Sequence, residues 1–427
     1  MPSLSRPARL VVLSSMVLLC ASGVFARQRP PGAVDLTAPD GLKLKATFFP
    51  ASAPGPGVLL LHQCNRQRKV WDALAQDLSA AGIHVLTLDY RGYGESDGER
   101  FDVLPQAEAA RIQQEKWPGD IDAAFAYLLA QPGVKKDTIG VGGASCGVQN
   151  SVQTARRHPE VKSLVLLSGA TDLNGRAFLR TATVPVFFSF ADDDEFQPTV
   201  LIMQWLYSLT GTPQKTLARF AKGGHGSDMF PVQKQLPKQI TDWYVHTLIT
   251  SPGRAPAGKD RPRLANEVEI LNTIDQPGGA ATVTRQLDDA RKRDPKAQLF
   301  PEELVNFVGY EHLQSGDVKG AVAIMQLNAR AYPASANVYD SLGDAYLADG
   351  QTDLARESSE KALAMLKTDT SIDDARRAAI RASAEGKLKQ LGPRKAPRAW
   401  NDYAGGPDGS RFVAATQISN IAYALPR

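Results

Sequence analysis

A regular alternation of apolar stretches and amphipathic segments, from Val58 to about Ile249, constrains the fold of this chain more than any other feature. The apolar stretches have the length of buried strands, and the segments between them have the length of helices. This alternation predicts an α/β fold, a doubly wound and mostly parallel sheet with helices on both faces. The expected strands are Val58–Leu61, His84–Leu88, Thr138–Val141, Ser163–Leu167, Val184–Phe190 and Thr216–Phe220. The expected helices are Val70–Ala80, Asp120–Ala130, Val148–Arg157, Thr199–Leu209 and Val232–Leu248.

The domain boundaries follow from changes in composition. Leu42–Phe49 is an expected antiparallel edge strand, so we place the α/β domain at residues 34–250. Residues 251–265 are rich in proline, glycine and charge, which predicts a linker. Residues 266–391 lack strand signals and predict an all-α domain, followed by a loose C-terminal tail at residues 392–427.

Two segments of the all-α domain repeat with a period of 34 residues, so that Gly309 matches Gly343 and Gly316 matches Gly350. Small residues at such positions let the two helices of a hairpin approach closely, and the pattern resembles a pair of tetratricopeptide repeats. Asn266–Pro295 is an expected capping hairpin before them. We expect the repeats to bind a protein partner or a macromolecule that carries the substrate.

The N-terminus predicts export. Arg6 and Arg9 precede the apolar stretch Leu10–Cys20, which is too short to span a bilayer stably, and Ala26 lies where signal peptidase reads small residues. We therefore expect a signal peptide at residues 1–26 and a secreted or periplasmic protein. The alternatives are an uncleaved anchor or a lipoprotein modified at Cys20, although Leu19 precedes that cysteine where a small residue is needed.

Charge and metal-ligand spacing disfavour two classes of function. The net charge is +4, but no dense lysine and arginine tract supports nucleic-acid binding. The six histidines and three cysteines show no metal-ligand spacing, so we expect neither a metal nor an organic cofactor.

The sequence "GASCG" places Ser145 between Gly143 and Gly147, with an expected strand before it and an expected helix after it. A nucleophile in this position stands on a sharp turn, where bulky neighbours two residues away would clash with the adjoining backbone. The following helix would direct its N-terminal N–H groups at a developing oxyanion. The stretch predicts a nucleophile elbow, and the alternative is an ordinary glycine-rich turn.

A candidate acid and a candidate base follow the serine, in the chain order that enzymes with a nucleophile elbow use. The strand in "VPVFFSFADDDEFQPT" ends in the aspartates Asp192, Asp193 and Asp194, and "FAKGGHGSDMF" supplies His225 in a glycine-flanked loop before the final helix. With these landmarks, residues 58–248 resemble an α/β-hydrolase of the dienelactone-hydrolase-like branch.

The resemblance implies a role for each of these residues. Ser145 would be the nucleophile and His225 the general base and acid. The family's acid lies three residues after the small residue that ends its strand, which gives Asp194 when counted from Ala191, with Asp193 as the alternative. The aspartate would hold the tautomer of the imidazole and stabilise the imidazolium.

The oxyanion hole requires two backbone N–H groups, and the resemblance implies that Cys146 supplies one of them. Gln63 or Cys64 would supply the other, because the family's strand ends in His-Gly where this chain has His62-Gln63. The replacement of that glycine by glutamine leaves the second donor open and puts a polar side chain near the site. We expect His62 itself to be structural.

The two cysteines that remain after signal cleavage, Cys64 and Cys146, both fall beside this expected oxyanion hole. A disulfide between them is conceivable in an oxidising compartment. The side chain after an elbow nucleophile often turns into packing, however, so the sequence favours two thiols.

The leading hypothesis is a secreted serine hydrolase that cleaves a carboxyl ester, lactone or amide through an acyl-enzyme on Ser145, without a cofactor. A rival hypothesis is a catalytically inactive scaffold that serves the helical repeats. A third makes Cys146 the nucleophile, but Ala144 and Val148 flank it in place of glycines. No large cap fits between residues 168 and 183, and the insertion at Asp97–Pro118 is an expected small flap over the cleft.

Overall fold

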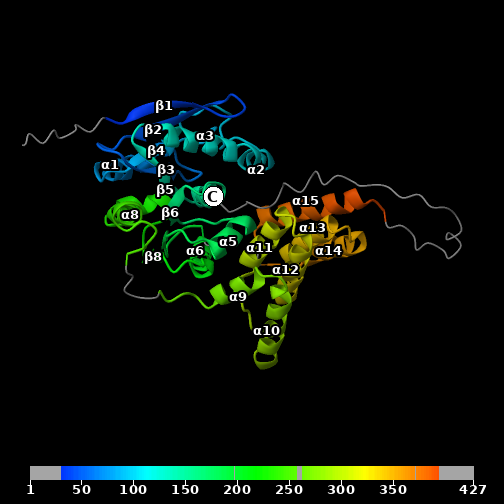
Figure 1. The fold of residues 1–427 in the computed structure, drawn as a ribbon. Coiled ribbons are helices and arrows are strands. Elements are labelled where there is room, and N and C mark those ends of the chain that lie inside the picture. The colour runs from blue at the N-terminus through cyan, green and yellow to red at the C-terminus, as the bar shows by residue number, and fades with distance from the viewer. Residues whose placement is uncertain (1–29, 197, 257–261, 371, 394–427) are drawn as a thin grey trace, which may run out of the picture.

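The computed structural model describes residues 30–196, 198–256, 262–370 and 372–393. Its N-terminal part is built on one eight-stranded sheet with the order β1-β2-β4-β3-β5-β6-β7-β8 (Figure 1). The six strands β3 to β8 all run parallel. This is the fold class that the alternation predicts. The strands are β1 (Gly32–Thr37), β2 (Lys43–Phe49), β3 (Gly55–Leu61), β4 (His84–Leu88), β5 (Val134–Ala144), β6 (Val161–Leu167), β7 (Val186–Ala191) and β8 (Lys215–Phe220).

The antiparallel strand expected at Leu42–Phe49 is present as β2, but the prediction that it forms the edge of the sheet was wrong. β1 forms the edge, and it pairs antiparallel with β2, which in turn pairs antiparallel with β4. A turn that contains Gly41, with a φ of +90°, joins the two strands into a hairpin. Only a residue that accepts positive φ without strain suits this place, and glycine does.

Helices cover both faces of the sheet because the strands are buried on both sides. Leu59 and Leu61 of β3 belong to the apolar cluster beneath α3, α4 and α6, whereas Val58 and Leu60 belong to the cluster beneath α1 and α8. Successive residues of a strand point to opposite faces, which explains this division. The helices of this part are α1 (Asp72–Ala80), α2 (Gln106–Glu115), α3 (Trp117–Ala130), α4 (Cys146–Arg157), α5 (Leu173–Thr181), α6 (Pro198–Leu209), α7 (Met229–Val232) and α8 (Leu236–Val245).

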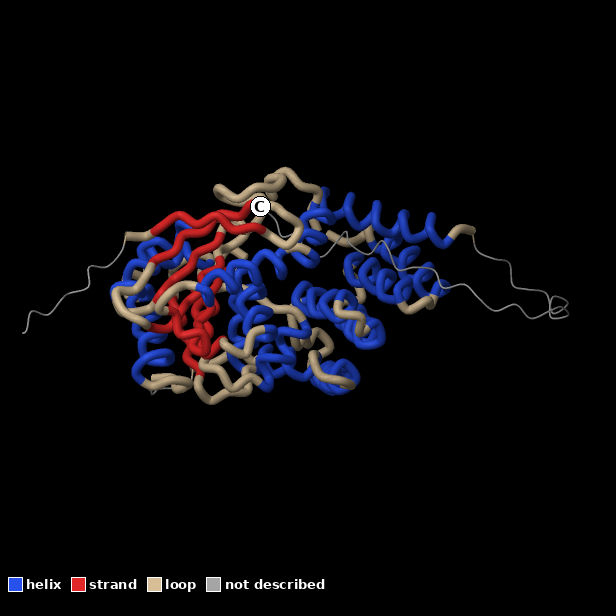
Figure 2. The backbone as a smooth tube through the Cα atoms, turned by 45° about the horizontal axis from the view of Figure 1, so that its top comes forward, coloured by secondary structure: helices blue, strands red, loops and turns tan. Residues whose placement is uncertain are grey.

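The C-terminal part is all helical across its described residues (Figure 2) and lies beside α5 and α6 (Figure 1). The starts of α11 and α13 are 34 residues apart, as are those of α12 and α14, which matches the period seen in the sequence. The identity of these hairpins as tetratricopeptide repeats stays a prediction. The helices are α9 (Glu267–Ile274), α10 (Gly279–Arg293), α11 (Glu302–Gln314), α12 (Val318–Ala331), α13 (Ala336–Ala348), α14 (Thr352–Met365) and α15 (Asp374–Leu391).

The two parts share one apolar core. Leu206 of α6 and Leu271 of α9 belong to the same cluster of buried side chains, which continues into α10, α11 and α12. The indole N–H of Trp205 donates to Asn272 Oδ1 at 2.9 Å across the same contact. The helical part therefore packs directly on the sheet domain instead of hanging from the linker.

Two predictions lie outside the described residues. The expected signal peptide falls within residues 1–29, and the expected tail falls almost wholly within residues 394–427. Among the helices that the structure describes, none is both long and apolar enough to cross a membrane.

Candidate active site

Ser145 occupies a strained turn between β5 and α4. Its backbone angles, a φ of 55° and a ψ of −120°, lie in a region that residues other than glycine rarely adopt. Such backbone strain is concentrated at functional sites. A Cβ on Gly143 would lie 2.1 Å from the carbonyl oxygen of Gly147, and one on Gly147 would lie 2.4 Å from that of Leu61. Both glycines are thus needed for the turn to close, for the steric reason that the sequence indicates.

The imidazole of His225 is held by Asp194. His225 Nδ1 lies 2.9 Å from Asp194 Oδ1 and 2.8 Å from Oδ2, and both side chains are buried. The other two aspartates have different hydrogen-bond and ion-pair partners. Asp193 Oδ1 accepts from the N–H groups of Gly223 and Gly224, at 2.7 and 2.9 Å. Of the three carboxylates, Asp194 is the one that the structure places against the histidine.

Asp192, the third aspartate, forms an ion pair with Arg219 at 2.7 Å near the surface. β7 ends at Ala191, so Asp194 stands three residues beyond the strand, as the resemblance implies. The alternative, Asp193, supports the backbone of the loop that carries the histidine.

The histidine loop lies against the serine turn. A Cβ placed on Gly226 would be 3.2 Å from the Cβ of Ala144, the residue before Ser145. The ring of Phe196 packs on the imidazole of His225 with the ring centres 4.5 Å apart. Among the described residues, no hydrogen bond joins Ser145 Oγ to His225. Such bonds are often long in the absence of substrate and tighten in the complex.

The segment after β3 is bound covalently to the serine turn. Cys64 and Cys146 form a disulfide with their Cα atoms 5.9 Å apart, so the prediction of two thiols was wrong. This separation is ordinary for a disulfide. The expectation failed because the sulfur of Cys146, at the start of α4, faces the loop that carries Cys64. The bond fixes the two loops that carry the expected oxyanion-hole donors.

The same segment also contacts the histidine loop. Gln63 Oε1 accepts from the backbone N–H of Ser227 at 2.7 Å and from its hydroxyl at 2.9 Å. Three residues later along the loop, Arg66 forms a two-point ion pair with Asp228, at 3.1 and 2.8 Å. Sequence reasoning missed both contacts, since their members are more than 160 residues apart in the chain.

Comparison with known proteins matches part of the sheet domain to one family model. Residues 53–193 match the family model described as serine aminopeptidase, S33. The matched stretch covers about a third of the chain, contains Ser145 and ends one residue before Asp194.

The sheet domain has the α/β-hydrolase fold and is called the hydrolase domain. Similar curated proteins include the thiohydrolase aneE of Aspergillus aculeatus, 30% identical over 31% of this chain and 39% of that protein. The thiohydrolase apmlB of Arthrinium phaeospermum is 30% identical over 31% of this chain and 40% of that protein. This chain spans less than half the length of these relatives. A solved esterase from Pyrococcus furiosus is 16% identical, with a TM-score of 0.43, over 52% of this chain and 91% of that one.

A cavity of about 790 Å³ opens beside the disulfide of the hydrolase domain. The expected flap at residues 97–118 borders it through Arg100, Phe101 and Asp102. Its helix α2 reaches the disulfide, where Gln113 Nε2 lies 3.8 Å from Cys64 Sγ. The ring of Phe101 stacks near those of Tyr93 and Trp117, with ring centres 5.1 and 5.2 Å apart. The lining residues are Cys64, Asn65, Arg66, Gln67, Lys69, Val70, Gly92, Tyr93, Gly94, Arg100, Phe101 and Asp102.

The loop between β6 and α5 links the nucleophile helix to the helical domain. Gln149 of α4 accepts from the hydroxyl of Thr171 at 2.6 Å and from the N–H of Asp172 at 2.9 Å. Arg176 of α5 donates to the carbonyl of Thr171 at 2.8 Å and reaches Asp275 of α9 at 2.9 Å. Between β6 and β7 the structure describes a single helix, α5, so no large cap is inserted between these two strands.

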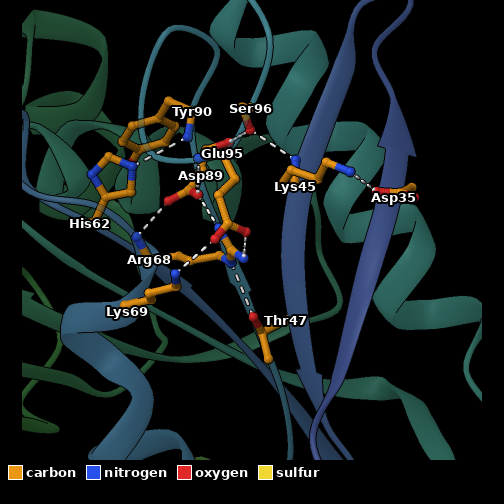
Figure 3. A network of polar contacts seen from close by, with 10 residues as sticks. All are labelled: Asp35, Lys45, Thr47, His62, Arg68, Lys69, Asp89, Tyr90, Glu95 and Ser96. Carbon is orange, nitrogen blue, oxygen red and sulfur yellow. Dashed lines mark hydrogen bonds and ion pairs between the residues drawn. The ribbon is translucent and has the colours of Figure 1, made fainter.

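A network of polar contacts surrounds the buried ion pair of Arg68 and Asp89 (Figure 3). The guanidinium of Arg68 pairs with Asp89, and it also reaches Glu95 at 2.5 Å. His62 is fully buried, with Nδ1 2.8 Å from the carbonyl of Gln63 and Nε2 accepting from the N–H of Tyr90 at 3.2 Å. Burial lowers the pKa of His62 to about 4, so this ring is neutral at physiological pH. These contacts suit a structural role for His62.

No cluster of three or more histidine, cysteine, aspartate or glutamate side chains that could hold a metal ion is found in the part of the chain that the structure describes.

Proposed function

We propose that the protein is a serine hydrolase that cleaves a carboxyl ester, thioester, lactone or amide through an acyl-enzyme on Ser145. The observation that carries this proposal is the combination of a strained serine at the strand–helix turn with a buried Asp194–His225 pair on the neighbouring loops. We add thioesters to the substrate classes because two similar proteins are named thiohydrolases.

The chemistry would proceed in two steps. Ser145 Oγ attacks the carbonyl carbon while His225 Nε2 takes its proton, and His225 then passes that proton to the leaving group. Asp194 accepts the hydrogen bond of Nδ1–H and stabilises the imidazolium. A water activated by His225 then releases the acyl group from the serine.

The negative charge that develops on the substrate oxygen needs backbone donors. The candidates are the N–H of Cys146 at the start of α4 and the N–H of Gln63 or Cys64. The disulfide holds the two loops that carry them next to each other. The loss of one such donor typically costs about 3 kcal/mol in the transition state. The partial positive charge at the start of α4 acts in the same direction.

Two further features of the protein remain proposals. The N-terminal sequence supports a secreted or periplasmic location. The helical domain supports a binding role toward a protein or toward a macromolecule that carries the substrate, because stacked helical hairpins present extended surfaces.

Active-site labelling tests the proposal against the inactive-scaffold hypothesis. A fluorophosphonate probe should label the protein, and the Ser145→Ala variant should neither be labelled nor hydrolyse p-nitrophenyl esters. Ser151→Ala is the matched control, because Ser151 is a buried serine on the same helix whose hydroxyl bonds to the carbonyl of Gly147. Labelling that persists in Ser145→Ala, or folded wild-type protein that takes no label, contradicts the proposal.

A further inference from the structure

We propose that the side chain of Gln63 is a positioning residue that fixes His225 relative to the oxyanion hole, an inference that rests on the proposed function. Gln63 follows directly after His62 at the end of β3, where the α/β-hydrolase pattern has glycine. Its side chain therefore adds contacts that a glycine at this place could not make.

The amide of Gln63 is fully buried and bonded at both ends. Its oxygen accepts two hydrogen bonds from Ser227, at 2.7 Å from the backbone N–H and 2.9 Å from the hydroxyl. Its nitrogen donates to Asn65 Oδ1 at 2.9 Å. Because donor and acceptor are both used, the amide has one orientation, and Ser227 is held in one place relative to β3.

Gly226 completes the fit between the two loops. It has a φ of +59°, and a Cβ at this position would lie only 2.4 Å from Gln63 Oε1. The glycine that follows His225 thus leaves room for the Gln63 amide, and the two residues form a matched pair. The backbone on the C-terminal side of the histidine is pressed against the oxyanion segment and bonded to it.

The consequence for catalysis is geometric. Asp194 sets the rotation of the imidazole from one side, and Gln63 sets the position of its backbone from the other. The N–H of Gln63 or Cys64 belongs to the same segment as the Gln63 side chain, so the base and the oxyanion donor keep a constant separation. A displacement of about 1 Å between such groups can lower the rate about a hundredfold.

The test compares Gln63→Leu with a variant that breaks an exposed ion pair outside the cavity lining. Gln63→Leu should lower kcat for p-nitrophenyl esters about tenfold to a hundredfold, with KM changed less than about threefold, because substrate contacts stay in place. Arg219→Met removes the ion pair with Asp192, whose side chains are 45% and 36% exposed, and should change kcat less than about threefold. Equal effects of the two variants, or a kcat of Gln63→Leu within threefold of wild type, overturn the inference.

Gln63→Glu separates positioning from simple support of the fold. The glutamate keeps an acceptor for Ser227 and nearly the same shape, so this variant should fold and keep more activity than Gln63→Leu. Its kcat should therefore lie between that of Gln63→Leu and that of wild type, with KM changed less than about threefold. A kcat no better than that of Gln63→Leu refutes the positioning role.

Ser145→Ala, measured in parallel, distinguishes a failure of the proposed function from a failure of the Gln63 inference. Turnover that survives in Ser145→Ala defeats the proposed function, and the inference fails with it. Turnover that depends on Ser145 but is indifferent to Gln63→Leu defeats the inference alone.

Discussion

Replacing Arg176 with methionine should weaken the attachment of the helical domain to the hydrolase domain. The guanidinium is almost completely buried and lies 2.9 Å from Asp275 and 3.2 Å from Glu311, both of which belong to the helical domain. It also donates to the carbonyl of Thr171, and it lies over the ring of Trp205 at 4.8 Å. Methionine fills much of the same volume but offers none of these donors or charges.

The expected loss in free energy of unfolding depends on the partners that Asp275 and Glu311 keep after the substitution. Breaking a buried ion pair by removing one partner costs about 3–5 kcal/mol. Asp275 keeps Arg180 at 2.8 Å and His312 at 3.3 Å, and burial raises the pKa of Glu311 to about 7, so that it can take up a proton near neutral pH. We therefore expect a loss near the lower end, about 3 kcal/mol. Arg180→Met, at a quarter-exposed site, should cost about 1 kcal/mol.

Urea unfolding measures this difference when it is combined with hydrogen exchange. Exchange should accelerate in α9 and α11 of Arg176→Met more than in β3 to β6, since the lost contacts belong to the interface. Turnover should also fall, because Thr171 lies on the loop bonded to α4. A loss of stability in Arg176→Met no greater than that in Arg180→Met refutes the reasoning, as does faster exchange spread evenly over both domains.

Asp194→Asn should lower ester turnover by about four orders of magnitude, because the imidazole loses its orienting carboxylate, whereas Asp193→Asn keeps an acceptor for the loop N–H groups and should lower it less than about tenfold. Non-reducing mass spectrometry of a digest should find the peptides of Cys64 and Cys146 linked, and reduction should lower turnover; two alkylated thiols in unreduced protein would contradict this. Burial raises the pKa of Glu311 from 4.5 to about 7, so the folded state holds a proton that the unfolded chain releases, and urea stability should fall as pH rises from about 5 to 7. Glu311→Gln should flatten this fall, and an unchanged slope would show that Glu311 is not its source.

Much of the hydrolase domain could be predicted because its signals are local. Apolar runs define strands whatever their partners, and β4 has the predicted bounds, His84–Leu88. The turn at Ser145 was visible because its glycines and its serine lie within five residues. β1 was missed although Val34 and Leu36 alternate with polar residues, and the stretch "PDG" before β2 is a hairpin signal.

The contacts that join the loops could not be read from the chain. A glutamine beside a histidine has no local pattern that predicts a bond to Ser227, 164 residues later. The disulfide also depends on the direction of two Cβ bonds, which sequence spacing does not determine. The attachment of the helical domain through Arg176 was hidden for the same reason, since arginine on a short helix ordinarily faces water.

The core shared by α6 and α9 has a consequence for how the protein is made. During synthesis, α6 is complete when Leu209 has been added, but its apolar partners on α9 do not exist until the chain reaches Ile274. At about 5–20 residues per second, a ribosome needs several seconds to add that stretch. Through that interval, the hydrolase domain carries an uncovered apolar face, which makes it a client for holding chaperones. An early stop codon in the linker should therefore yield a product that aggregates or is degraded instead of a smaller working enzyme.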